Sequence, residues 1–454
     1  MDVNGGLIRN IIFPLMESLK GNNIRKNLKY LQNTQSLPRH ELKALQENKL
    51  KVLLTYCIER VPAYSDYGDL RKDINRDPFA ALDKFPILTK KKFMESPDSY
   101  LSSNVEKSSL VPNRTGGSTG EPVKFYIDRK TVEFYEAARW RGLSWSDINI
   151  GDRSVMIWGS PIELGQQQRL VYKAKERFLK NRIIIPAYDL NPKSINQYMD
   201  TINAFKPKYF YGYASSLTLF ADMMLSSKTK LNFLPKGVVS TAETLHDFQR
   251  EKIERAFGCK VINEYGARDG GILAYQCQKG NMHITFENAV IEIVDLQSKK
   301  RVDPGNSGLL LVTDLNNFSM PRLRYQLGDV ASISAQACTC EVTLPMLEKI
   351  QGREDDTFFS LEGSFIHGHF FNHIARNLDG IKQFQIIQHE RNRLSLKIVK
   401  GQNFQDSEVR YFIDKITKAM GRVEVRVEFV EAIPTSGSGK IRYAIREFPL
   451  NSGN

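Results

Sequence analysis

The chain has 454 residues, of which 25% are charged and 41% are hydrophobic. This length accommodates two or three domains and excludes a small scaffold that depends on disulfide bonds. The 30 glycines and 18 prolines are typical of a globular protein and exclude a collagen-like or low-complexity chain. Lys and Arg outnumber Asp and Glu by 64 to 51, and the net charge of +13 favours anionic partners.

The excess positive charge is compatible with nucleotides, coenzyme A, an anionic glycan, an anionic membrane surface or nucleic acid. No RNP, zinc-finger or helix-turn-helix signature accompanies it, so we expect no specific nucleic acid partner. A solvated charged surface without any specific partner explains the charge equally well. The sequence does not indicate the oligomeric state.

No apolar run approaches the roughly 18 residues of a membrane span. The best stretch, Leu7–Leu19, is interrupted by Arg9, Asn10, Pro14 and Glu17. The first residues also lack the basic and apolar regions of a signal peptide. We therefore expect a cytoplasmic protein, in which the five cysteines are thiols or metal ligands and do not form disulfides.

Helical spacing dominates about the first 105 residues, which we expect to form a packed helical entrance to the fold. Proline at position 62 marks the end of one helix. The apolar residues that recur at helical spacing before it are Leu42, Leu45, Leu50, Leu53, Leu54 and Cys57.

Between about residues 111 and 331, short β-branched or aromatic runs alternate with amphipathic stretches. This alternation predicts an α/β architecture with largely parallel sheets. The predicted strands are Val155–Trp158, Arg182–Tyr188, Tyr209–Tyr213, Lys236–Thr241 and Lys260–Gly266.

A different pattern begins at Ala289, where two apolar runs joined by a turn predict an antiparallel element that closes the large domain. We expect residues 1–352 to form a large N-terminal domain and residues 353–454 to form a small C-terminal lid domain. The lid is predicted to be a β-β-α-β unit made of Phe384–Glu390, Leu394–Lys400, Ser407–Met420 and Val423–Glu431.

A loop rich in glycine and hydroxyl residues, Arg114–Pro122, precedes a predicted strand. Glycines allow the backbone to approach a phosphate, and the hydroxyl residues supply donors. The loop continues with Glu121, where a Walker loop would have lysine, so a P-loop NTPase is not indicated. A plain turn is the alternative. The candidate phosphate-binding residues are Thr115, Gly116, Gly117, Ser118, Thr119 and Gly120.

Further motifs follow this loop: YGYASSL, STAET, NEYGARD, RLRYQLGDV, GREDD and IPTSGSGKIR. In their order and separation they resemble those of the adenylate-forming superfamily, specifically the phenylacetate-coenzyme A ligase family and its relatives in capsule gene clusters. The resemblance covers nearly the whole chain. It implies a large domain that binds ATP and a carboxylic acid, and a small lid domain that carries the catalytic lysine.

The NEYGARD string resembles the fifth motif of the family, in which an aromatic ring stacks on adenine. This resemblance assigns the stacking on adenine to Tyr265 and places Gly266 in the same nucleotide-binding motif. A tyrosine packed in the core at a strand end is the alternative. The family motif usually ends in Thr-Glu, and its glutamate helps to hold magnesium. Here Arg268-Asp269 takes that place. Asp269, or Glu264 as its substitute, is therefore the expected Mg²⁺ ligand.

The STAET string resembles the adenine-contacting segment of the family and points to Ser240, Ala242 and Glu243. A helix N-cap explains the same Ser-Thr-Ala-Glu pattern equally well. Asp329 ends a Gly-Asp pair, and its carboxylate is able to accept hydrogen bonds from both ribose hydroxyls.

The GREDD string resembles the segment at which the lid domain rotates. The resemblance assigns Arg353 to the ribose or a phosphate, and Asp355 to the hinge. Lys440 lies in a glycine- and serine-rich loop that resembles the tenth motif, whose lysine contacts the substrate carboxylate and the α-phosphate. Stabilisation of charge there lowers the barrier to attack at phosphorus. We therefore expect Lys440 to be catalytic.

Three cysteines and one histidine form two short clusters that suit tetrahedral zinc, with no position left open for catalysis. Similar ligand sets occur in some phenylacetate-coenzyme A ligase relatives. Small buried thiols without a metal are the alternative. The predicted zinc ligands are Cys277, His283, Cys338 and Cys340, whereas Cys57 and Cys259 are predicted to lie in the core.

The resemblance implies a ligase that uses magnesium ATP to convert a carboxylic acid into acyl-AMP and then transfers the acyl group. The acceptor is coenzyme A, or an amine, a sugar or a carrier in polysaccharide biosynthesis. The acid pocket is expected to involve Trp158, Tyr188, Tyr211 and Tyr213, for which simple packing is the alternative. A nucleotide-binding or nucleic-acid-binding protein without catalysis is the alternative function.

Overall fold

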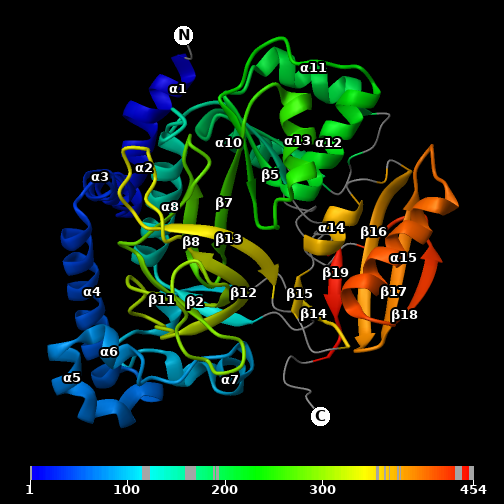
Figure 1. The fold of residues 1–454 in the computed structure, drawn as a ribbon. Helices are drawn as coiled ribbons and strands as arrows, with labels where there is room; N and C mark the ends of the chain where they lie inside the picture. Colours follow the sequence, from blue (N-terminus) through cyan, green and yellow to red (C-terminus); the bar gives the residue numbers. More distant parts are fainter. Residues whose placement is uncertain are drawn as a thin grey trace.

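The computed structural model describes residues 3–114, 123–158, 170–187, 190, 194–353, 357–361, 365–367, 369–375, 378, 380–434 and 442–448. Within these ranges, none of the helices combines the length and the apolar character that crossing a membrane requires. Figure 1 shows a large body built around a long twisted sheet, with a smaller C-terminal group of strands and helices beside it.

Helices form the first hundred residues, as predicted. A π-helical turn, Ile8–Ile12, lies just before Pro14. Proline cannot donate to the preceding turn and its ring clashes with the carbonyl four residues back, so a wider turn relieves the conflict. The helices are α1 (Val3–Leu7), η1 (Ile8–Ile12), α2 (Phe13–Lys20), α3 (Ile24–Thr34), α4 (Arg39–Arg60), η2 (Pro62–Leu70), α5 (Arg71–Arg76), α6 (Pro78–Leu82), α7 (Lys90–Glu95), η3 (Pro97–Tyr100) and η4 (Lys107–Ser109).

An 11-stranded sheet organises the central part of the chain, in the order β10-β11-β12-β13-β9-β8-β7-β6-β5-β3-β4. Pairing is parallel from β4 through β3, β5 and β6 to β7. The five strands predicted there are confirmed within a few residues at their ends. The strands of this half are β3 (Ser154–Trp158), β4 (Arg182–Pro186), β5 (Tyr209–Tyr213), β6 (Gly237–Thr241) and β7 (Val261–Ala267).

The helices that alternate with these strands are α8 (Arg129–Ser144), α10 (Leu170–Leu179), α11 (Ile195–Phe205), α12 (Ala214–Ser226) and α13 (Asp247–Phe257).

Strand pairing from β7 onward is antiparallel, and the predicted hairpin after Ala289 is confirmed as β10 paired with β11. The strands of this half are β8 (Gly271–Gln276), β9 (Met282–Ile284), β10 (Ala289–Val294), β11 (Gly308–Asp314), β12 (Tyr325–Ile333) and β13 (Met346–Arg353).

The antiparallel half contains a narrow join at β9, which is only three residues long. On one side β9 pairs with β8, and on the other it pairs with β13 through two residue pairs, Met346 with His283 and Leu347 with Met282. The predicted fold class is therefore confirmed, with the added feature that the parallel and antiparallel parts form one continuous sheet.

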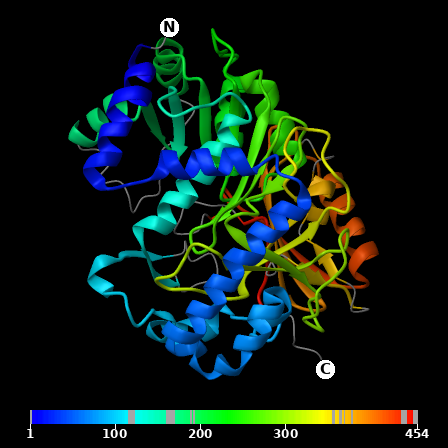
Figure 2. The same cartoon turned by 90° about the vertical axis from the view of Figure 1, so that its left-hand side faces the viewer.

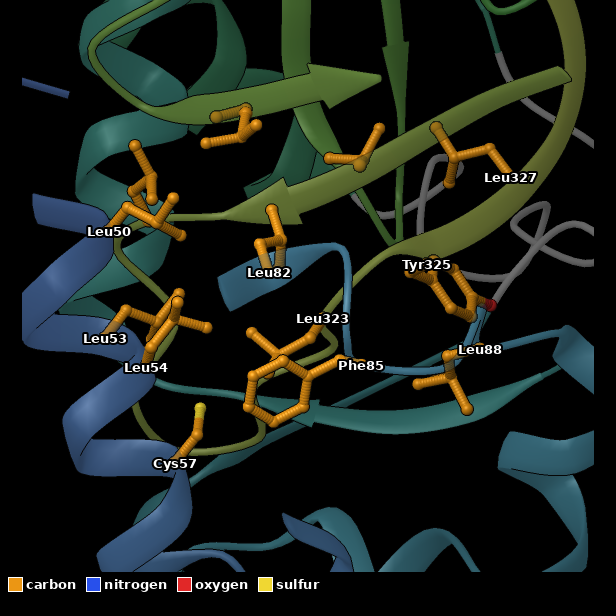
Figure 3. Packing of buried hydrophobic residues seen from close by; sticks show 14 of the residues in the cluster. Leu50, Leu53, Leu54, Cys57, Leu82, Phe85, Leu88, Leu323, Tyr325 and Leu327 are labelled. Carbon is orange, nitrogen blue, oxygen red and sulfur yellow. The ribbon is translucent and has the colours of Figure 1, made fainter. Parts of the chain in front are cut away.

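A hydrophobic core lies between the N-terminal helices and the antiparallel strands (Figure 3). Leu50, Leu53 and Leu54 on α4 are fully buried in the same cluster as Leu323 and Leu327. Because these residues are more than 250 positions apart in the sequence, their burial fixes the helical entrance onto the sheet.

The C-terminal part contains a 4-stranded sheet in the order β18-β17-β16-β19. The predicted β-β-α-β unit is confirmed, and a short strand, β19, extends it beyond the prediction. The domain limits at 352 and 353 remain a prediction; β13 continues in the large sheet as far as Arg353. The elements here are β14 (Thr357–Phe359), β15 (Phe365–His367), α14 (His369–Ala375), β16 (Ile381–Glu390), β17 (Arg393–Lys400), α15 (Asp406–Met420), β18 (Glu424–Phe429) and β19 (Ala444–Arg446).

Candidate active site

The carboxyl ends of neighbouring parallel strands bring several predicted site residues to one edge of the large sheet. The register pairs Tyr213 on β5 with Thr241 on β6, and Thr241 with Glu264 on β7. In open α/β sheets this edge is where ligands bind. The predicted strand Lys260–Gly266 contains both Glu264 and Tyr265, and pairing with β8 extends β7 as far as Ala267.

Glu264 is buried and both of its carboxylate oxygens are occupied by donors. Oε1 accepts from the Tyr211 hydroxyl at 2.6 Å and from Thr241 Oγ1 at 3.0 Å, while Oε2 accepts from Arg139 Nε at 3.3 Å. Burial raises the pKa of Tyr211 well above its ordinary value, so its hydroxyl remains protonated and donates. The network holds Glu264 as a rigid negative charge at the strand ends.

Tyr265 and Asp329 meet across the sheet although 64 residues separate them. The Tyr265 hydroxyl donates to Asp329 Oδ2 at 2.7 Å. Asp329 on β12 lies opposite Arg353 on β13 in the antiparallel register. Three residues that the motifs connect with adenine, ribose and phosphate are therefore neighbours in the fold. At Gly266, a Cβ would lie 2.6 Å from the Gly271 carbonyl oxygen, so this position accepts only glycine without a backbone shift.

The segment after β6 is not the N-cap of the helix that follows it, so the N-cap alternative for residues 240–243 is wrong. Helix α13 begins at Asp247 and has His246 as its N-cap residue. The Glu243 carboxylate instead accepts from Ser215 N at 2.7 Å and from Ser215 Oγ at 2.9 Å, at the first turn of α12. This contact compensates the positive end of the α12 dipole.

Two features of the segment around Ala242 are typical of a functional turn. Ala242 has φ of 65°, a left-handed conformation that costs a non-glycine residue about 1–2 kcal/mol. The hydroxyl of Ser240 is buried and has no partner within the described part of the chain. Backbone strain and unsatisfied buried donors cluster at functional sites.

Asp269 lies in the turn between β7 and β8 and is buried. Its Oδ2 accepts from the Tyr325 hydroxyl at 2.9 Å, and its carbonyl accepts from Arg322 Nη2 at 2.9 Å. Of the two candidate magnesium ligands, Glu264 already has three donors on its carboxylate. A hard cation prefers carboxylate oxygen, and Asp269 is the less heavily bonded of the pair.

Several predicted residues lie outside the described residues: Thr115, Gly116, Gly117, Ser118, Thr119, Gly120, Tyr188, Asp355 and Lys440. The strands on either side of the phosphate loop are described, and β1 (Val111–Arg114) pairs with β2 (Lys124–Ile127) as an antiparallel hairpin. Three residues beyond Lys440, the ring of Tyr443 contacts the ring of His246 at 5.9 Å between centroids. Burial, and then the negative charge of Glu243, raise the pKa of Tyr443.

Aromatic rings gather beside these residues. The ring of Trp158 at the end of β3 stacks on Tyr213 with centroids 4.2 Å apart, and it lies 5.8 Å from the ring of Tyr211. Tyr211 and Tyr213 are buried, whereas Trp158 is half-buried and presents part of its surface. The burial of Tyr211 and Tyr213 agrees with the packing alternative. An acid pocket at the aromatic wall formed by Trp158, Tyr211 and Tyr213 stays a prediction.

The three cysteines and the histidine of the predicted metal site converge in the structure. The sulfur and ring nitrogen atoms of Cys277, His283, Cys338 and Cys340 all lie within 4.8 Å of one another. Cys277 Sγ lies 3.8 Å from Cys338 Sγ, and His283 Nε2 lies 3.2 Å from Cys340 Sγ. All five cysteines are free thiols. The cluster forms because β9 places His283 beside β13, next to the loop that carries both later cysteines.

The donor set fits zinc in chemistry and in size. Zn–S bonds of about 2.3 Å place two ligand atoms of a tetrahedron roughly 3.8 Å apart. His283 Nδ1 contacts the Leu344 carbonyl oxygen at 2.9 Å, which orients Nε2 toward the sulfurs in the manner of a supporting hydrogen bond to a metal ligand. Burial lowers the pKa of His283 and favours the neutral imidazole that binds metal.

Arg139 is not apparent from the sequence as a site residue. It lies on α8, where its i+3 ion pair with Glu136 at 2.7 Å is an ordinary surface pattern. Only the packing of α8 on the sheet directs its guanidinium toward Glu264 and the Tyr211 ring. Ser215 is missed for a similar reason, because its partner Glu243 follows it by 28 residues.

Comparison with solved structures defines the class of fold. A structure of 2-hydroxyisobutyryl-CoA ligase in the postadenylation state, in complex with R3-HIB-AMP, matches with a TM-score of 0.70 and 20% identity over 91% of each chain. The same ligase in complex with 2-HIB-AMP and CoA in the thioesterification state matches with a TM-score of 0.54 and 18% identity over 92% of each chain. The fold is that of the adenylate-forming enzymes.

Sequence comparison identifies relatives of the chain. Residues 358–447 match the CapK C-terminal domain family. Protein CapK from Staphylococcus aureus is 24% identical over 464 residues, which cover 96% of this chain and 97% of the relative. Phenylacetate-coenzyme A ligase from Thermus thermophilus is 24% identical over 339 residues, 72% of this chain and 74% of the relative. The chain is a relative of the adenylate-forming superfamily, which confirms the resemblance found in the motifs.

Proposed function

We propose that this protein is an adenylate-forming acid ligase. A carboxylate oxygen of the acid attacks the α-phosphorus of ATP, the bond to the β-phosphate oxygen breaks, and acyl-AMP and pyrophosphate result. A nucleophile then attacks the acyl carbon and releases AMP. Splitting the reaction makes chemical sense because a carboxylate is a poor acyl donor until its oxygen becomes part of a good leaving group.

The observation that carries the proposal is the convergence of Tyr265, Asp329 and the register partner Arg353 from three separate strands. In the proposal the Tyr265 ring stacks on adenine and the Asp329 carboxylate accepts from the ribose hydroxyls. Ser240 and the strained Ala242 contact the base from the end of β6. The loop 115–120 binds the phosphates.

Magnesium, when bound, neutralises phosphate charge and polarises the α-phosphate. We propose Asp269 as its ligand, because the Glu264 carboxylate already accepts from Tyr211, Thr241 and Arg139. In this arrangement Glu264 holds the aromatic wall and the strand ends in place. Asp269→Asn should raise the magnesium concentration required for half-maximal activity, and Glu264→Gln should mainly lower stability.

Lys440 is the proposed catalytic residue for the first half-reaction. The contact between Tyr443 and His246 supports this role, because it packs the segment next to Lys440 against the start of α13. Asp355 is the proposed hinge at which the lid rotates between the half-reactions.

Exchange of radioactive pyrophosphate into ATP over a panel of carboxylic acids tests the proposal. The panel should include aromatic acids, because Trp158 presents an aromatic surface beside the site. At least one acid should support exchange, and Lys440→Ala should lower it by roughly 10²- to 10³-fold, whereas the exposed Lys418→Ala should not. Binding of ATP without exchange for any acid would favour the non-catalytic nucleotide-binding alternative.

A lid that rotates at Asp355 between the half-reactions also leads to a prediction for the second half-reaction. Given pre-made acyl-AMP, Lys440→Ala should transfer the acyl group at nearly the wild-type rate. Asp355→Pro, which stiffens the hinge, should retain adenylation and lose transfer. Equal damage to both half-reactions in Lys440→Ala would show that the lysine acts structurally.

We propose coenzyme A as the first acceptor to test, with an amine or a sugar of polysaccharide biosynthesis as the alternative. The net charge of +13 favours an acceptor with phosphates or an anionic glycan. Mass spectrometry of the product formed from acyl-AMP with coenzyme A, with small amines and with sugars separates these acceptors.

We propose that Cys277, His283, Cys338 and Cys340 bind a structural zinc ion. Elemental analysis of protein purified without added metal should find about one zinc per chain. Cys338→Ser should lower the zinc content and the melting temperature. Cys259→Ser, a half-buried thiol outside the cluster, is the matched control and should retain zinc. Metal-free protein with wild-type stability would contradict the proposal.

A further inference from the structure

Four large apolar side chains lie exposed in a row along the N-terminal helix. Leu7, Ile11, Leu15 and Leu19 are 44%, 58%, 57% and 79% exposed and are spaced four residues apart. In a regular α-helix this spacing drifts around the axis, because four residues exceed one turn of 3.6. The π turn Ile8–Ile12 takes more residues per turn and offsets part of that drift. The result is a solvent-facing apolar stripe.

Other side chains of the helical segment 3–20 contact the body of the protein, so the stripe is held in place on the folded surface. Glu17 is buried and pairs with Arg25, and Arg9 Nη2 contacts Asp152 Oδ1 at 2.8 Å. Asn4 Nδ2 donates to Asn181 Oδ1 at 3.1 Å, just beyond the end of α10. Figure 2 shows this helix on the outside of the molecule. The outward face therefore lacks cover from the described part of the chain.

Basic residues outnumber acidic ones in the segments that carry and adjoin the stripe. Residues 3–40 contain six basic residues and one acidic residue, Glu17. The Arg129 guanidinium donates to the Lys20 carbonyl, which adds a further cation beside Leu19 at the end of α2. Near the other end, residues 170–182 contain five basic residues and one acidic residue, Glu176, which is buried.

Helix α10 repeats the combination of apolar and basic groups. Phe178 is 64% exposed and Leu179 is 39% exposed, and the exposed Lys173 and Lys175 precede them on the same helix. The Glu176 carboxylate is engaged by Lys180 Nζ at 2.9 Å and by Arg182, so the charge that it offsets belongs to those two residues. The bond between Asn4 and Asn181 brings this end of α10 next to the N-terminal helix.

We propose that the stripe and the exposed end of α10 form a docking surface for an anionic phospholipid bilayer. Apolar side chains that enter the headgroup region, flanked by lysine and arginine, are the features by which amphipathic helices lie on membranes. Nucleic acid or an anionic glycan would complement the positive charge but would not bury the apolar row. A second copy of this chain matches the apolar row and brings like charges together. This surface is independent of the proposed ligase activity.

Sedimentation with lipid vesicles tests the proposal on the full chain without ATP or acid. Wild type should bind phosphatidylcholine vesicles that contain about 30% phosphatidylserine, and should bind pure phosphatidylcholine at least tenfold more weakly. Binding should fall at about 1 M salt, where charge is screened within roughly 3 Å. Equal binding to both vesicles, or to neither, would overturn the proposal.

Paired variants separate the apolar and the charged contributions. Ile11→Ser with Leu15→Ser should lower partitioning by about tenfold or more, because buried methylene groups carry the insertion. Lys173→Gln with Lys175→Gln should lower it by roughly 25-fold, because each basic residue near an anionic leaflet contributes about fivefold.

The matched controls lie elsewhere on the surface. Leu234→Ser removes an apolar side chain that is 77% exposed, and Lys91→Gln with Lys92→Gln removes two exposed lysines of α7. Both controls should bind vesicles like wild type. Unchanged binding in the stripe variant would overturn the proposal. So would a wild-type dimer in light scattering that the stripe variant converts to monomer, because a second copy would then occupy the stripe.

Discussion

The hydrogen bond between Tyr265 and Asp329 provides a direct test of the nucleotide site. Tyr265→Phe retains the ring for stacking on adenine and removes only the donor that lies 2.7 Å from Asp329 Oδ2. A hydrogen bond to a charged group contributes about 1.5–3 kcal/mol. Because both side chains are only partly buried, we expect the lower end, about 1.5 kcal/mol. AMP binding should therefore weaken by about tenfold, since each 1.4 kcal/mol is one decade in affinity.

Calorimetric titration with AMP measures the effect, and Asp329→Asn completes a double-mutant cycle. If the tyrosine orients the carboxylate for ribose, the double variant should lose less affinity than the sum of the two single losses, by about 1 kcal/mol. Tyr411→Phe, on the distant helix α15, is the matched control and should bind AMP like wild type. Losses that add within about 0.5 kcal/mol would refute the reasoning, because the two side chains would then act independently.

Two further predictions concern the buried framework. Gly142→Ala should destabilise the protein by about 1–3 kcal/mol in urea unfolding, because the new Cβ would lie 2.1 Å from Cγ of the buried Tyr275 ring; wild-type stability would mean that the ring moves freely. Glu287→Ala should cost about 3–5 kcal/mol, since it leaves Arg141 buried without the carboxylate that now lies 2.7 Å from it. Arg141→Met with Glu287→Leu should recover much of that loss, and a double variant no more stable than Glu287→Ala would contradict the explanation.

Local patterns in the sequence predicted most of the fold. The strand at Tyr209–Tyr213 and the helix at Ser407–Met420 were predicted to within one residue, because hydrophobic periodicity and turn residues act over short range. The antiparallel pairing of β7 with β8 is a tertiary effect that the local pattern does not contain. The short strand β19 was missed for the same reason.

In the candidate site too, local motifs identify individual residues, and only the tertiary structure shows their contacts. The motifs singled out Tyr265 and Asp329, but only the register of the large sheet reveals that they contact each other. Cysteine and histidine spacing predicted four metal ligands, and the structure brings them together through β9. The roles of Arg139 and Ser215 depend on partners far along the chain, and no spacing rule connects them.

The short strand β9 has a consequence for how the protein assembles. With three residues, and two residue pairs to β13, it is the narrowest join in the large sheet. We expect the strands on its two sides to open as separate cooperative units in native-state hydrogen exchange. His283 lies in the middle of β9, so a metal ion bound by the cysteine cluster would stabilise this join. We then expect metal binding during folding to precede the contact between Tyr265 and Asp329, whose strands lie on opposite sides of β9.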